Sequence, residues 1–260
     1  MCGIAGLIGA ALAERPDVEE LVLAMIDAQR HRGPDGSGVF RDREAVLGHC
    51  RLAIVGLGDA GRQPMTSRDG RWTIAFNGEI FNYPEIRARL DGEFRSGTDT
   101  EVLLEACAAW GVERALGCAA GMFAFALWDG RKRELTLVRD RLGEKPAVYF
   151  WDGNVFGFAS ELKALGPLHG GLLDASAVDA YLGLGYVPAP LAIFRNCRKL
   201  EAGHLLRFKP GGAPHTSRWW FPECACRRLN PDSLHRLRGA HACRLRPRLH
   251  ETVVFGRKDP

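Results

Sequence analysis

The stretch MCGIAGLIG, residues 1–9, places a cysteine directly after the initiator methionine and follows it with glycine and a short apolar run. Chain ends are usually polar and poorly ordered, because few contacts tie them down. This apolar start instead predicts a buried strand that begins at about the second residue. The thiol at its head has two interpretations, a nucleophile or a small buried hydrophobe, and Cys2 alone does not decide between them.

Length and composition indicate an ordinary soluble protein. The 260 residues suffice for one large domain, or for a domain with an appendage, and 46% are hydrophobic and 25% charged. The sequence has no apolar run close to the roughly 20 residues of a membrane span and no basic-flanked signal segment. Its eight cysteines follow no disulfide framework spacing, which favours reduced thiols. We therefore expect a cytoplasmic protein.

Hydrophobic periodicity predicts alternating strands and helices over residues 1–200. Apolar residues spaced by three and four predict a helix that starts after Pro16 and is stopped by Gly33 and Pro34. A second helix is expected from Asp99, which would serve as its N-cap, and a third within residues 174–185. Strand-like segments occupy residues 38–42, 45–55, 72–81, 122–129, 134–140, 147–152 and 155–160. Turns at DGRKR and DGN join members of the last four as hairpins. This order predicts an α+β layered domain.

The last forty residues differ from the rest. Residues 221–260 hold eight Arg and one Lys against two Glu and two Asp, so they carry more than the whole net charge of +4. Such a basic segment with Cys and His is compatible with nucleic acid or zinc binding. However, Cys224 and Cys226 are too close for the usual zinc spacing, and several prolines interrupt any period. We expect an aberrant, disordered basic tail that binds neither.

The chemistry of Cys2 depends on its position. If Met1 is removed, the thiol and a free α-amino group share one residue, and an α-amine with a pKa near ~7.7–8.0 is an adequate base. A second element is FNGEIFN at residues 76–82, where an apolar run ends. The amide of Asn77 and the N–H of Gly78 are suited to hold the oxyanion of a tetrahedral intermediate. The competing interpretation is a simple Asn-Gly hairpin turn.

Several blocks together make the sequence resemble the class II glutamine amidotransferases, and more closely the glutamine-hydrolysing half of asparagine synthetases. The resemblance covers nearly all of residues 2–220. The matching blocks are CGIAG at 2–6, HRGPDGSG at 31–38, RLAIV at 51–55, NGEIFN at 77–82, GTDTE at 97–101, RDRLGEKP at 139–146, ASELKAL at 159–165 and YVPAP at 186–190. The resemblance implies an N-terminal-nucleophile fold, a four-layer αββα sandwich.

The resemblance also implies a role for each site residue. Cys2 would attack the side-chain carboxamide of glutamine to form a thioester, with its own α-amine as base and then acid. Asn77 and Gly78 would form the oxyanion hole. Arg51 would hold the substrate carboxylate, and Glu79 and Asp99 its ammonium group. The remaining lining residues of the expected pocket are Leu52, Ala53, Ile54 and Val55. Arg32, Asp35 and residues 139–141 are expected to be structural.

The implied organisation has three parts. Residues 2–195 would form the glutamine amidotransferase domain, residues 196–220 the start of a connection to an absent ATP-dependent synthetase domain, and residues 221–260 the tail. The expected partner is L-glutamine, with no metal or cofactor in this domain, because ATP and Mg belong to the synthetase domain. A homodimer is compatible with the sequence. Three alternatives remain: a non-catalytic glutamine-binding remnant, an amidotransferase with an acceptor other than aspartate, and a self-processing amidase of the same fold.

Overall fold

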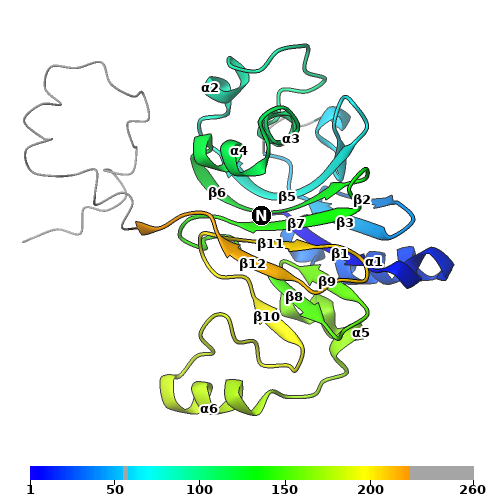
Figure 1. Ribbon diagram of the computed structural model, residues 1–260, viewed down its shortest axis with the longest axis vertical. Helices are drawn as coiled ribbons and strands as arrows, with labels where there is room; N and C mark the ends of the chain where they lie inside the picture. The colour runs from blue at the N-terminus through cyan, green and yellow to red at the C-terminus, as the bar shows by residue number, and fades with distance from the viewer. Residues whose placement is uncertain (55–57, 223–260) are drawn as a thin grey trace, which may run out of the picture. The chain divides into compact units, whose positions relative to one another are not determined.

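The computed structural model describes residues 1–54 and 58–222. The fold discussed below is one unit, Met1–Trp220, shown in Figure 1. The expected disordered tail lies outside the described residues, apart from Phe221 and Pro222.

The first strand lies in the middle of a six-stranded sheet, as the apolar start predicts. β1 (Gly3–Ile8) is buried along its whole length and pairs antiparallel with β3 (Ala45–Arg51) and with β9 (Phe156–Ala159). The sheet has the order β10-β8-β9-β1-β3-β2. Its other strands are β2 (Gly36–Arg41), β8 (Val148–Trp151) and β10 (Cys197–Lys199).

A second antiparallel sheet of six strands has the order β12-β11-β7-β6-β5-β4. Its strands are β4 (Met65–Thr66), β5 (Trp72–Ile80), β6 (Gly121–Asp129), β7 (Glu134–Arg139), β11 (His204–Phe208) and β12 (His215–Arg218). The two predicted hairpins are confirmed, since β6 pairs with β7 and β8 with β9 across the DGRKR and DGN turns.

Helices cover the outer face of each sheet (Figure 1). α1 (Val18–Asp27) packs on β1 and β3, while α3 (Asp99–Trp110) packs on β5. The other helices are α2 (Tyr83–Arg87), α4 (Val112–Cys118), α5 (Gly166–His169) and α6 (Ala175–Leu184), and the short 3-10 helices are η1 (Ala10–Glu14), η2 (Arg30–Arg32), η3 (Asp59–Gly61) and η4 (Leu162–Leu165). The predicted α+β sandwich with two sheets between helical layers is confirmed.

Three apolar clusters fill the spaces between these layers. The central cluster joins the sheets through large side chains such as Trp128, Phe158 and Phe208. The outer clusters join each sheet to its helices, with Val22 among the residues under α1 and Leu104 among those under α3. Because the first strand contributes to two of the clusters, its position is fixed from both faces.

The sheets differ from the expectations at two places. Residues 196–220, expected to begin a connection, contribute β10, β11 and β12 to the two sheets. The stretch 77–79 lies inside β5 and pairs with β6, from Asn77 opposite Ala124 to Glu79 opposite Met122, so it is not a hairpin turn. The strand continues through this polar triplet because β6 pairs with β5 along its whole length.

None of the helices in the described part of the chain has the length and apolar character needed to cross a lipid bilayer.

Candidate active site

The backbone around Cys2 is held on both sides by side chains from other elements. Gly3 lies opposite Cys50 in the ladder between β1 and β3, so Cys2 stands at the end of a paired strand. One residue further on, the N–H of Ile4 donates to Ser160 Oγ at 3.0 Å, and Gln29 Nε2 donates to the Ile4 carbonyl at 3.2 Å. The head of β1 is therefore ordered, unlike an ordinary chain terminus.

Arg32 fixes the carbonyl of Cys2 itself. Its Nε donates to Cys2 O at 2.9 Å, and its Nη1 forms an ion pair with Glu161 at 2.8 Å. The Arg32 side chain is only 8% exposed, so the clamp is largely shielded from water. The sequence analysis expected a structural role for Arg32 and none for Glu161. Both residues lie in blocks that match the family, Arg32 in HRGPDGSG and Glu161 in ASELKAL.

The thiol of Cys2 faces the backbone of Leu52. Cys2 Sγ accepts from the Leu52 N–H at 3.4 Å, and its distance to the Leu52 carbonyl is 3.7 Å. Burial raises the pKa of this thiol, and the Leu52 hydrogen bond and the positive charge of Arg51 offset that only in part. The thiol is consequently protonated at neutral pH, and a nucleophilic role requires a base that removes its proton.

The segment that follows β3 is anchored beside this thiol. Ala53 donates its N–H to Asp35 Oδ2 at 2.8 Å, which gives Asp35 the structural role expected of it. Arg51 Nη1 donates to the carbonyl of Gly58 at 2.9 Å and so ties the two ends of the segment. Ile54 is 67% exposed, whereas the predicted lining residue Val55 lies outside the described residues.

Asn77 is the most unusual residue of the candidate site. It is completely buried in β5, and within the described residues neither its Oδ1 nor its Nδ2 has a hydrogen-bond partner. An unpaired buried amide costs roughly 1–3 kcal/mol, so native proteins keep one only where something else uses it. The adjacent carbonyl of Phe76 accepts from His49 Nε2 at 3.0 Å, which connects β5 to β3 close to the head of β1.

The N–H of Gly78 points away from β6. The N–H groups of Phe76 and Ile80 are bound on that outer edge, by Gln63 Oε1 at 2.7 Å and by Asp99 Oδ2 at 2.9 Å. Alternate residues of a strand direct their N–H groups to the same edge, and Gly78 lies midway between these two. A Cβ at Gly78 would lie 2.4 Å from the Met122 carbonyl, so glycine is required by packing on β6, not only by approach to a ligand as expected.

Asp99 and Glu79 form a pair of carboxylates at the same edge. Asp99 is 6% exposed and accepts from the N–H groups of Ile80 and Thr100. Burial raises the pKa of Asp99, and the neighbouring charge of Glu79 acts in the same direction. The expected N-cap role of Asp99 is wrong, since the helix begins at Asp99 and is capped by Thr98, whose side chain accepts from the Glu101 N–H. Because Thr98 and not Asp99 caps the helix, the Asp99 carboxylate is available to the candidate site.

His49 is buried beside these residues, yet it is neutral. Burial lowers its pKa to about 4, and its Nε2 is bound by the Phe76 carbonyl. A buried neutral imidazole held in this way is a poor proton acceptor at physiological pH. His31, from η2, places its Nε2 3.0 Å from Glu161 Oε1.

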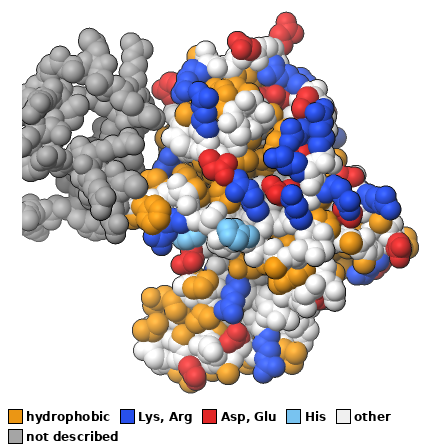
Figure 2. Space-filling view, in the orientation of Figure 1, with side chains coloured by type: hydrophobic (Ala, Val, Ile, Leu, Met, Phe, Trp, Pro, Cys, Tyr) orange, Lys and Arg blue, Asp and Glu red, His pale blue; other side chains and the backbone are white. Residues whose placement is uncertain are grey.

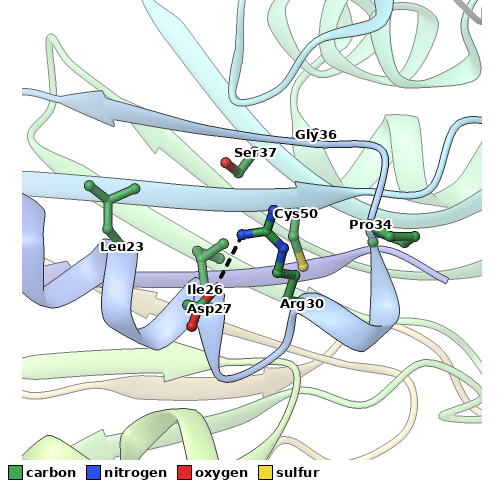
Figure 3. Close-up of a pocket in the computed structure, with 9 residues that line it drawn as sticks. Leu23, Ile26, Asp27, Arg30, Pro34, Gly36, Ser37 and Cys50 are labelled. Carbon is green, nitrogen blue, oxygen red and sulfur yellow. Dashed lines mark ion pairs between the residues drawn. The ribbon is translucent and has the colours of Figure 1, made fainter.

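A cavity of about 220 Å³ lies between the helical layer and the first sheet (Figure 3). Arg30 and Asp27 face each other at its rim with an ion-pair distance of 3.5 Å. The lining residues are Leu23, Ile26, Asp27, Arg30, Gly33, Pro34, Gly36, Ser37 and Cys50. Cys50 and Arg51 are consecutive strand residues and so point to opposite faces of the sheet. The cavity therefore lies on the face of the sheet opposite to the Arg51 side chain.

Comparison with known proteins gives consistent results. Residues 1–220 match the family model of a glutamine amidotransferase domain. A putative glutamine-hydrolysing asparagine synthetase of Methanocaldococcus jannaschii is 37% identical over 233 residues, covering 80% of this chain and 44% of that protein. Glutamine-hydrolysing asparagine synthetase 1 of Bacillus subtilis is 36% identical over 217 residues, covering 82% of this chain and 34% of that protein. The chain thus spans between about a third and a half of these relatives.

The fold also matches a solved structure. Glutamine phosphoribosylpyrophosphate amidotransferase from B. subtilis, in complex with ADP and GMP, superposes with a TM-score of 0.63 and covers 85% of this chain and 50% of its own. At 20% sequence identity this likeness concerns the fold alone. It confirms the α+β sandwich of two sheets expected from the sequence.

Proposed function

This chain belongs to the glutamine amidotransferase domain family, and on that premise we propose that it hydrolyses glutamine to glutamate and ammonia with Cys2 as the nucleophile. The observation that carries the proposal is the fully buried carboxamide of Asn77, which has no hydrogen-bond partner within the described residues. The proposal requires removal of Met1, because only then does Cys2 possess a free α-amino group.

The proposed reaction starts with a proton transfer within one residue. The thiol proton of Cys2 moves to its α-amine, and Sγ bonds to the side-chain carbonyl carbon of glutamine. The raised pKa of the thiol makes such a base necessary. The carbon–nitrogen bond then breaks, and the leaving ammonia takes the proton back from the α-ammonium. Water next attacks the thioester carbonyl carbon and gives a proton to the α-amine. The carbon–sulfur bond then breaks, the α-ammonium returns that proton to the thiolate, and glutamate leaves.

The oxyanion of both intermediates would be held by the Asn77 amide and the Gly78 N–H. Both belong to β5, a strand paired along its length with β6, so the donors are in place before substrate arrives. Such preorganised donors stabilise the developing charge without reorganisation during the reaction. All groups used in these steps are supplied by the protein, and we propose no metal or cofactor for this domain.

Recognition of glutamine would use the charges around the thiol. Arg51 affects the Cys2 thiol as a neighbouring positive charge, and Asp99 affects it as a negative one. We propose that Arg51 binds the substrate α-carboxylate with those of its five N–H donors that face the site. Asp99 and Glu79, which lie close enough to influence each other, would bind the α-ammonium group. We also propose that Leu52, Ala53, Ile54 and Val55 line the pocket.

The assignment of Cys2 is tested by a glutaminase assay on the whole chain after mass spectrometry has verified loss of Met1. We expect Cys2→Ala to abolish glutamate release while glutamine still binds by calorimetry. Cys118→Ala is the matched control, because this half-buried cysteine lies at the end of α4 and should retain full activity. Activity in Cys2→Ala would move the nucleophile elsewhere. Binding without turnover by the processed wild type would favour the glutamine-binding remnant.

The oxyanion hole is tested with Asn77→Ala. Removal of one oxyanion donor typically lowers kcat by about 10²–10³-fold, and the KM for glutamine should change little. A raised KM with kcat unchanged would instead assign Asn77 to uniform binding of the ground state and the transition state.

The destination of the ammonia is a further part of the proposal. Because the relatives compared above are named asparagine synthetases, we propose that the ammonia serves asparagine formation in a reaction that also needs ATP, Mg and aspartate. Residues 1–220 would supply only the glutamine-hydrolysing half. With glutamine, aspartate and ATP present, this chain should release glutamate and ammonia without asparagine. Asparagine formation by the chain alone would contradict this division, and an acceptor other than aspartate remains the alternative.

A further inference from the structure

Lys145 places a buried cation at the N-terminus of the chain. Its side chain is among the buried ones, with the residue 5% exposed, and its Nζ lies 3.3 Å from Met1 Sδ. The position is enforced by the preceding loop, in which the buried Asp140 carboxylate accepts the N–H groups of Leu142, Glu144 and Lys145. Lys145 is thus directed to Met1 by a preorganised loop.

A second cation reaches the same sulfur. Arg32 Nη2 is 3.9 Å from Met1 Sδ, and the same guanidinium holds the carbonyl of Cys2. Arg32 is paired with Glu161, whereas across residues 1–54 and 58–222 no carboxylate lies within 4 Å of Lys145 Nζ. Burial of a cation without an anionic partner is costly, and such groups are retained mainly where their charge acts on a neighbour.

After removal of Met1, both cations would lie near the new N-terminal amino group. Five covalent bonds separate Met1 Sδ from the nitrogen of Cys2 and span at most about 6.5 Å, so that nitrogen lies within about 10 Å of Lys145 Nζ. This is within the distance over which charges interact in a partly buried site. An α-ammonium group at Cys2 would therefore face a like charge.

We propose that Lys145 is a positioning residue that disfavours protonation of the mature α-amino group of Cys2 by charge repulsion, and so keeps that amine available as the base. The inference rests on the proposed function, in which this amine takes the thiol proton. It assigns a role to a residue of the RDRLGEKP block, which the reaction steps above leave unused.

Other charges also act at this end of the chain. On the cationic side are Arg32 from η2 and Arg51 from β3, and on the anionic side are Asp99 from α3 and Glu79 from β5. Further titratable neighbours are Glu161, which is bound by Arg32, His31 and Lys163, and the thiols of Cys2 and Cys50. At Lys145 itself, the Asp140 carboxylate accepts the backbone N–H and Arg139 Nε donates to the carbonyl. All of these are unchanged in a variant of Lys145, so its effect can be measured against a constant background.

The test is a titration of the amine itself, made on the whole processed chain. Cysteine labelled with ¹³C and ¹⁵N reports the protonation of the Cys2 α-amine by NMR, and the pH profile of glutaminase kcat/KM is recorded in parallel. We expect Lys145→Met to move the titration midpoint and the acidic limb of the activity profile upward by about one pH unit. Lys145→Arg should keep the wild-type midpoint. Lys132→Met, which removes an exposed cation from the β6–β7 turn, is the charge-matched control.

Each outcome bears on one of the two proposals. An unchanged midpoint in Lys145→Met, or equal shifts in the Met and Arg variants, overturns the role of Lys145 while hydrolysis stands. A shifted midpoint without any turnover in the wild type supports the role of Lys145 and sinks the proposed hydrolysis. If Lys145→Met does not fold, Lys145→Gln carries the same test, because its side chain is neutral but polar.

Discussion

The helices α3 and α6 have similar lengths and both carry a side-chain N-cap, yet their surroundings are opposite. α3 buries nine of its twelve residues, among them three carboxylates. α6 buries only Ala177 of its ten, although most of its side chains are apolar. Figure 2 shows hydrophobic side chains gathered on the surface over the part of the molecule where α6 lies. α3 is thus held by tertiary contacts along most of its length, whereas α6 is held mainly at its ends.

The buried carboxylates explain why α3 belongs to the site. Asp99, Glu101 and Glu105 each accept a backbone N–H from a different segment: Ile80 at the end of β5, Ser96 before the helix, and Arg68 after β4. The helix thereby organises the loops around the free edge of β5. Within the described residues, hydrogen bonds tie the base of α6 to the fold, such as the Asp174 N–H donated to the Ile193 carbonyl at 2.9 Å. Helices of ten residues are marginal alone, so these connections must hold it.

The largest difference between the helices is expected for deletion of an apolar side chain. Leu104→Ala in α3 empties space in the cluster beneath the second sheet and should lower the free energy of unfolding by about 2–5 kcal/mol. Leu184→Ala in α6 removes an exposed side chain and should change it by less than about 0.5 kcal/mol. Urea denaturation of both variants measures the contrast. Equal losses would show that α6 is covered in solution.

Removal of a buried charge from α3 should cost somewhat less. Burial tends to raise the pKa of Glu101, but hydrogen bonds from Ser96 and Arg95 outweigh it and hold this pKa below its ordinary value of 4.5. Glu101→Gln loses these charge-assisted bonds, which are worth about 1.5–3 kcal/mol at neutral pH. Exposed Glu93→Gln is the control and should be neutral.

The stabilisation that the Glu101 carboxylate provides should depend on pH in a defined direction. Because the folded-state pKa of Glu101 is lowered, its contribution is fully present above about pH 4.5 and is lost as the pH falls through the folded-state value. Denaturation midpoints of the wild type and Glu101→Gln should therefore converge toward acidic pH. A constant gap between them down to pH 3 would mean that the carboxylate acts only through shape.

The two helices also show what the sequence reveals about the fold. The spacing of apolar residues predicted α1, α3 and α6 alike, because an amphipathic pattern identifies a helix whether or not a partner exists. The pattern cannot tell that α6 has no covering layer in the described residues, since that depends on what the rest of the fold brings near. The strands of residues 197–218 were missed for a related reason: they are short, and their pairing with β8 and β7 sets their ends.

The residues of the candidate site could be proposed from the sequence, but their arrangement in space could not. The roles of Asn77, Arg51 and Asp99 came from resemblance to a family. In the structure, the charge of Arg51 lowers the pKa of the Cys2 thiol and that of Asp99 raises it, although burial has the larger effect. The clamp between Arg32 and Glu161 joins positions 129 residues apart, and only the register of β1 with β3 and β9 brings them together. No local pattern carries that information.

The N-cap of α6 provides a smaller effect. Asp174 Oδ1 accepts from the N–H of Ser176 at 3.0 Å and of Ala177 at 3.3 Å. Asp174→Ala removes both and should destabilise the helix by about 1 kcal/mol. Because few tertiary contacts hold α6, the loss should appear as faster amide hydrogen exchange confined to residues 175–184, with the global unfolding transition almost unchanged. Asp174→Asn keeps an acceptor and should exchange like the wild type. Faster exchange throughout the sheets would indicate that α6 is coupled to the core.

The smallest effect is expected at the most exposed apolar side chain of α6. Leu182 is 77% exposed, so replacement by glutamine removes almost no buried surface, and leucine and glutamine have similar helix propensities. The free energy of unfolding of Leu182→Gln should stay within about 0.5 kcal/mol of the wild type, measured at several protein concentrations. A loss that grows with concentration would reveal an apolar contact between copies of the chain. A loss of 2 kcal/mol or more at every concentration, on the order of a buried leucine, would contradict the exposed position and would remove the contrast with α3.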